Sequence, residues 1–168
     1  MRTLIALAAC LLLASTAVAQ QTEIKIAIFN LQKVVTESDV LKDAQAAIKK
    51  DFDPRKSSLE KENASLQKLA ETLRSGKPTE QQRKDFMAKQ QAYSKKTNEF
   101  VTDFQKAEMR VRSDVDRVIL AAAETYARKK GYDLILDNAA AIYAGGLTDV
   151  TSDMLSETNA QWRSMKKK

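Results

Sequence analysis

Residues 79–130 contain neither glycine nor proline, and this stretch constrains the fold more than any other feature of the sequence. A helix of that length would be on the order of 75 Å long at about 1.5 Å per residue. A compact domain of this size is narrower than that. The helix must therefore project from the rest of the molecule.

Apolar residues at heptad spacing flank a turn signal, Ser75-Gly76-Lys77-Pro78-Thr79. Two such helices joined by a tight turn predict an antiparallel coiled-coil hairpin. Its register places Leu69 opposite Phe86 and Phe52 opposite Phe104. The predicted seam residues are Phe52, Leu59, Leu66, Leu69, Leu73, Phe86, Tyr93, Phe100 and Phe104.

The hairpin pattern has interruptions. Arg55 and Glu62 fill seam positions on the first helix, and Gln90 and Thr97 fill them on the second. Pro54 lies inside the first helix, where proline removes a backbone donor, so we expect it to kink or restart the helix there.

Outside the hairpin the pattern changes to short strands. Residues 23–29 alternate like a strand, and residues 132–137 and 141–144 predict two more, joined by a short turn at Asn138. Gly131, just past three basic residues, predicts the end of the long helix. Residues 148–162 predict a closing helix.

The predicted fold class is therefore α+β. Residues 20–47 and 111–168 form a small β-containing body, and residues 48–110 form the projecting hairpin, with its tip near 75–79. Three strands make a poor independent sheet with unpaired edges, and a barrel shared between copies would remove those edges. The residues expected in this oligomeric body are Ile26, Ile28, Leu134, Leu136, Ile142 and Tyr143.

Residues 1–19 predict a secretory signal peptide, with a positive start, an apolar run and the cleavage signal Ala17-Val18-Ala19. A competing lipoprotein box, Leu7-Ala8-Ala9-Cys10, would leave an apolar run shorter than a signal peptide needs. We expect cleavage after Ala19, and a periplasmic location if the source is a Gram-negative bacterium. The chain after the cleavage site has no cysteine.

Positive charge is concentrated on the hairpin. Residues 54–107 hold twelve basic and seven acidic side chains, and the rest of the processed chain holds fifteen of each. Such a field favours anionic partners. Candidates are acidic polypeptides, lipopolysaccharide and anionic lipid; export and the lack of interleaved stacking aromatics argue against nucleic acid. The candidate contact residues at the tip are Arg74, Lys77, Arg83, Lys84, Lys89 and the apolar Met87.

The sequence has no histidine, which excludes every site that needs an imidazole. Four glycines are too few for a phosphate-cradling loop, and no catalytic constellation is present. We therefore expect no enzyme activity, no cofactor and no metal.

Four segments resemble the Skp/OmpH-like periplasmic chaperone family, in the family's order: residues 26–35, 130–137, 142–144 and 149–155. They read IAIFNLQKVV, KGYDLILD, IYA and DVTSDML. Asn30, where an Asp is common, and Gly145-Gly146 depart from the family pattern. The hairpin matches only as a coiled coil, so no client-binding residue carries over.

The resemblance implies a jellyfish-like homotrimer whose strands form a central barrel and whose three hairpins surround a cavity. It also implies an ATP-independent holdase for unfolded outer-membrane β-barrel proteins. Three alternatives remain open. They are a coiled coil that bridges envelope components, a tip that binds lipopolysaccharide or a membrane surface, and a nucleic-acid binder whose first residues are not a signal.

Overall fold

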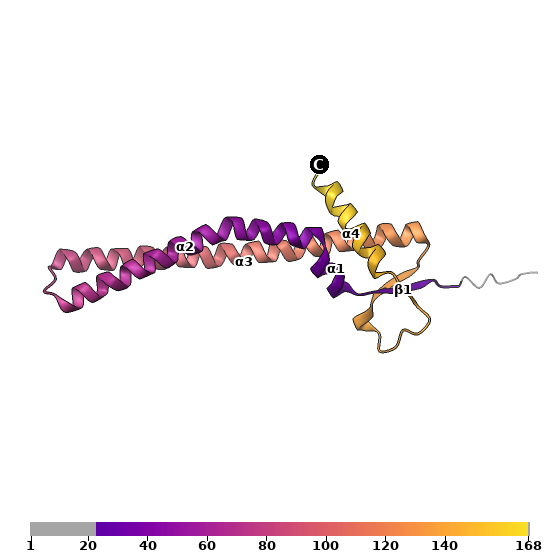
Figure 1. The fold of residues 1–168 in the computed structure, drawn as a ribbon, viewed down its shortest axis with the longest axis horizontal. Coiled ribbons are helices and arrows are strands. Elements are labelled where there is room, and N and C mark those ends of the chain that lie inside the picture. Colours follow the sequence, from indigo (N-terminus) through magenta and orange to yellow (C-terminus); the bar gives the residue numbers. More distant parts are fainter. Residues whose placement is uncertain (1–22, 168) are drawn as a thin grey trace, which may run out of the picture.

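The computed structural model describes residues 23–167 and shows a long helical arm on a small body (Figure 1). The predicted signal peptide lies outside the described residues. The elements in chain order are β1 (Ile26–Phe29), α1 (Leu31–Glu37), α2 (Asp39–Ser75), α3 (Glu80–Lys130), β2 (Leu134–Asp137), the 3₁₀ helix η1 (Asn138–Ala140), β3 (Thr148–Asp149) and α4 (Thr151–Met165).

The arm consists of α2 and the part of α3 beside it, which run antiparallel from the body to the tip (Figure 1). The 51 residues of α3 form one uninterrupted helix. Its start is fixed by a capping box, because the Thr79 side chain accepts from the backbone of Gln82 and the Gln82 side chain accepts from that of Thr79. The tip turn lies between Ser75 and Glu80, where the sequence predicts it.

The helix does not restart at Pro54. A single helix, α2, runs through this residue, and the proline is exposed. Proline has no N–H, so the Lys50 carbonyl loses its helical donor. Exposed at this position, that carbonyl can be satisfied by water. The helix begins instead after a break at the buried Ser38, whose hydroxyl caps α2 by accepting from the Leu41 N–H.

The sheet is parallel throughout, with strand order β2-β1-β3. The prediction of a third strand at residues 141–144 is wrong. Because β3 runs parallel to β1, the chain must return to the far side of β1 after β2. Residues 141–147 make that return as an irregular loop, and Thr148–Asp149 form the strand instead.

The closing helix, α4, begins at Thr151 and not at Thr148, because the preceding residues pair with β1. The Val150 N–H donates to the Ile28 carbonyl at 2.8 Å. Asp149 then accepts from the backbone N–H of Thr151 and from its hydroxyl, and these hydrogen bonds lower the pKa of Asp149.

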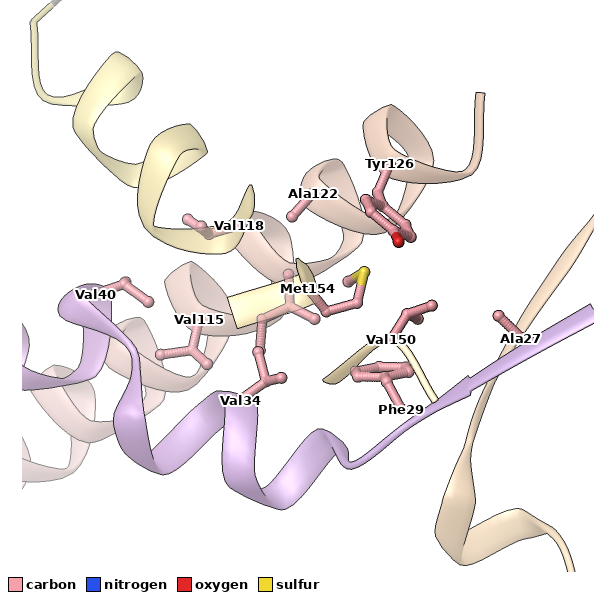
Figure 2. Packing of buried hydrophobic residues seen from close by; sticks show 11 residues of the cluster. Ala27, Phe29, Val34, Val40, Val115, Val118, Ala122, Tyr126, Val150 and Met154 are labelled. Carbon is pink, nitrogen blue, oxygen red and sulfur yellow. The ribbon is translucent and has the colours of Figure 1, made fainter. Parts of the chain in front are cut away.

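The core lies where β1, α1, the C-terminal part of α3 and α4 meet (Figure 2). Met154 of α4 is fully buried at its centre, among side chains that include Val34, Val118 and Phe29. Truncating such a side chain to alanine costs about 2–5 kcal/mol of stability. Tyr126 of α3 is buried in the same core and stacks on Tyr132. Burial, followed by its hydrogen bond to Asp153, raises the pKa of its hydroxyl.

Within residues 23–167, no helix combines the length and apolar character needed to cross a membrane.

Candidate functional site

An aromatic cluster holds the two arm helices together near the body. Phe52 of α2 packs edge-to-face against Phe104 and Phe100 of α3, with ring centroids 5.2 and 5.7 Å away. The predicted contact between Phe52 and Phe104 is therefore confirmed. Each such aromatic pair adds about 0.5–1.5 kcal/mol beyond the area it buries.

The polar residues in the α2 seam have partners across the arm. Arg55 lies over the Phe52 and Phe100 rings and donates to Asp103 at 2.9 Å. Glu62 accepts from Lys96 at 2.9 Å. Sequence reasoning identified Arg55 and Glu62 as interruptions but missed Asp103 and Lys96, although the predicted register places them close by.

The structure places the other predicted seam residues on the inner sides of α2 and α3. Leu66 is buried, whereas the rest are half-buried: Leu59, Leu69, Leu73, Phe86 and Tyr93. A shallow hollow of about 270 Å³ lies between Leu66, Phe86 and Tyr93. The seam at Leu66 is therefore incompletely filled.

The predicted contact residues at the tip are exposed on both helices and in the turn. They are Arg74, Lys77, Arg83, Lys84, Lys89 and Met87. Lys84 contacts Glu80 at 2.8 Å, one helical turn earlier. Such exposed pairs contribute only about 0.3–0.5 kcal/mol, so Lys84 can exchange this partner for another anion at little cost.

One face of the sheet packs on the helices, and the other does not. Ala27 and Phe29 of β1 are buried against the core, whereas the intervening Ile26 and Ile28 point to the opposite face. The parallel register sets them beside Leu134 and Leu136 of β2. These four apolar side chains form the open sheet face.

The loop between β2 and β3 carries the remaining predicted body residues. Ile142 is fully exposed, and Tyr143 is 87% exposed. The Tyr143 ring lies against Gly145, where a side chain on residue 145 would meet the hydroxyl. The loop therefore presents two large apolar side chains that do not contribute to the core of the single chain.

The C-terminal end of α4 is attached to the base of the arm. Asp43 of α2 accepts from the Trp162 indole and from Lys166, both at 2.8 Å. The hydrogen bond from Lys166, followed by that from Trp162, lowers the pKa of Asp43. Arg163 contacts Asp39 at 3.0 Å. Sequence reasoning missed these contacts, and no local pattern could have revealed them.

Among residues 23–167, no three His, Cys, Asp or Glu side chains lie together in a way that could hold a metal ion. What the described residues offer for binding is three surfaces: the charged arm, the open sheet face and the apolar loop between β2 and β3.

The family model described as "Outer membrane protein (OmpH-like)" matches residues 25–157, which is most of the chain. The chain therefore belongs to the OmpH-like family, and the resemblance seen in the sequence is confirmed.

Two relatives, each named chaperone protein Skp, align with this chain over most of its length and most of their own. The protein from Pectobacterium atrosepticum is 27% identical over 153 residues, which cover 88% of this chain and 92% of the relative. The protein from Escherichia coli K12 is 28% identical over 155 residues, which cover 90% and 96%.

A solved structure has the same fold. It is an OmpH-like protein from Caulobacter crescentus CB15. It aligns with a TM-score of 0.68 at 20% identity, over 83% of this chain and 86% of the other.

Proposed function

We propose that this protein is an ATP-independent holdase chaperone of the periplasm, which keeps unfolded outer-membrane β-barrel proteins from aggregating. The observation that carries the proposal is the arm, which projects from a small body and has more basic than acidic side chains. Family membership and the chaperones among its relatives support it.

A homotrimer is part of the proposal. The open sheet face and the exposed Ile142 and Tyr143 are apolar surface that a single chain leaves in water. Both outer strands of the sheet, β2 and β3, also have an edge without a strand partner within the described residues. Three copies that close their sheets into one barrel would bury this face and pair these edges.

Three arms attached to one barrel would surround a cavity. An unfolded barrel protein exposes alternating apolar residues and unpaired strand edges, which make it prone to aggregate. Many weak contacts with three arms would hold it without a tight site, since multivalency raises the effective affinity while each contact still breaks easily. The basic arms favour acidic clients.

The test is to dilute a urea-unfolded outer-membrane β-barrel protein into nucleotide-free buffer with the processed chain and to record turbidity. We expect suppression that saturates near one client per three chains. If a folded, helical protein gives no suppression, the holdase proposal is wrong. Binding to anionic vesicles that salt abolishes would then favour the membrane-surface alternative.

The role of the tip charges is tested by the triple variant Lys77→Glu, Arg83→Glu and Lys84→Glu. The three side chains are exposed, so the arm should stay folded. We expect weaker capture of acidic clients at low salt with an unchanged oligomer. Equal capture by variant and wild type at low salt would contradict the electrostatic part of the proposal.

A further inference from the structure

One side of α3 carries no charge between Met87 and Met109, along most of the arm. At about 100° per residue, eight residues fall within an arc of about 100° on the helix surface. We call them the neutral stripe: Met87, Gln91, Ser94, Asn98, Val101, Thr102, Gln105 and Met109. Phe86, Tyr93 and Phe100 of the seam point in a different direction, toward α2.

The neutral stripe is solvent-facing. All eight residues are exposed, and its three apolar side chains are 66% (Met87), 45% (Val101) and 64% (Met109) exposed. Residues 87–109 also include seven charged side chains, and none of them falls in the stripe. Exposed helix faces carry charged or polar residues, and this one combines uncharged polar residues with two exposed methionines, a residue type that is over-used at adaptable binding surfaces.

A row of lysines borders the stripe. Lys84, Lys95 and Lys106 recur every eleven residues, close to three helical turns, so they follow one edge of it. A shallow hollow of about 550 Å³ lies between the stripe and the lysine row. The stripe contributes Ser94, Asn98 and Thr102 to its lining, and the row contributes Lys95 and Lys106. Of the acidic residues at this hollow, Asp103 contacts Arg55 at 2.9 Å. Glu99 lies 4.0 Å from Lys95 of the row, an exposed and weak pair that a client carboxylate can displace.

We infer that the neutral stripe and its lysine row are the face of the arm that contacts the client. Its occupant is an extended, unfolded polypeptide segment that carries both apolar and acidic side chains. This inference rests on the proposed function and adds the face of the arm and the chemistry of the segment.

The side chains of the stripe fit this occupant. Asn, Gln, Ser and Thr both donate and accept hydrogen bonds, as the unpaired backbone of an unfolded chain does. The flexible methionines adapt to apolar side chains of different shapes. The lysine row is complementary to carboxylates in the same segment.

Two other occupants fit less well. A membrane surface binds a helix through a continuous apolar face, whereas the stripe has only three apolar residues over 23 positions. A second copy of this face packed antiparallel would oppose one lysine row with another, which disfavours the contact.

Site-specific cross-linking tests the inference. The chain after the predicted cleavage site has no cysteine, so a single introduced cysteine can carry a benzophenone. Ser94→Cys places it on the stripe. Ser57→Cys, the same exchange at an exposed position of α2, is the matched control. With a urea-unfolded outer-membrane β-barrel protein as the probe, we expect at least fivefold more client cross-link from residue 94.

Equal yields from residues 94 and 57 would overturn the inference. Cross-links from residue 94 that join two copies of this chain, and not the client, would also overturn it. Wild-type suppression of turbidity reports on the holdase proposal independently, so failure of the stripe and failure of the holdase function are distinguishable.

A second variant set tests the apolar contribution of the stripe. Met87→Gln, Val101→Gln and Met109→Gln together keep good helix formers at exposed positions, so the arm should fold. We expect the amount of chaperone needed for half-suppression to rise at least threefold. The control is Ala46→Gln, Ser57→Gln and Ala64→Gln on the exposed side of α2. The same half-suppression for both sets would contradict a specific role of the stripe.

Discussion

At Gly131 the chain leaves α3 with a φ of 69°, in the left-handed region that residues with a side chain adopt at a cost. A Cβ built there would meet no atom within 4 Å, so only the backbone conformation opposes substitution. We expect Gly131→Ala to lower the free energy of unfolding by about 1 kcal/mol and Gly131→Asn to lower it less. Urea denaturation followed by circular dichroism measures both, and a wild-type midpoint for Gly131→Ala would contradict the argument.

Glu62 tests the polar seam at the scale of one side chain. It occupies a seam position and is 29% exposed, and its partner Lys96 is mostly exposed. Glu62→Leu would bury apolar surface in the seam and free a lysine that water can solvate. We expect a gain of about 1 kcal/mol in the free energy of unfolding. Glu60→Leu, on the exposed side of the same helix, is the control and should give no gain.

Among the elements, the long helices could be predicted best. The heptad spacing gave the contact between Phe52 and Phe104, and the glycines and prolines marked both ends of the arm turn and the end of α3. Thr79 and Gln82 also carry the pattern of a capping box, which sequence reasoning passed over. These features depend on residues near one another in the chain.

The short elements could not be predicted equally well. Residues 141–144 have a strand-like composition, but whether they pair depends on which edge of β1 is available, and Thr148–Asp149 occupy it. The contacts of Asp43 with Trp162 and Lys166 join positions more than a hundred residues apart. No local periodicity encodes such pairings. The neutral stripe, by contrast, is readable from the helical period once α3 is known.

The attachment of α4 to α2 should depend on pH. The pKa of Asp43 is lower in the folded chain than its ordinary value of 3.8, so the contact stabilises at pH above that value and is lost as the pH falls through the folded pKa. Trp162 is the single tryptophan, so its fluorescence reports on this contact. We expect an acid transition with a midpoint below pH 3.8, with α-helical circular dichroism recorded alongside.

The matched variants are Asp43→Ala and Asp53→Ala, both at exposed positions of α2. Asp43→Ala should show the acid-type emission of Trp162 already at neutral pH, because the indole has lost its acceptor. Asp53→Ala should behave like wild type. Identical emission from all three proteins at neutral pH would show that the contact is absent in solution.

For the whole molecule, the open sheet face is the surface on which the proposed trimer depends. Ile28 lies on it beside Leu136, away from the core of its own chain. Ile28→Asp should therefore dissociate the proposed trimer while each chain keeps its helical arm, because the charge would be buried only in the assembly. Light scattering measures the mass, and a variant that stays trimeric would place the interface elsewhere. Thr36→Asp, an exchange at an exposed position of α1, is the control.

The sheet pairs strands that the whole arm separates in the sequence, and this long sequence separation bears on the order of folding. Ile26 pairs with Leu134 across the whole arm, and closing so long a loop is entropically costly unless something shortens it. The helical hairpin shortens this loop, because it brings the chain back from the tip of the arm to its base. We expect arm amides to become protected before those of β1 in pulsed hydrogen exchange. A newly made chain would then have its arm before it has a body on which to assemble.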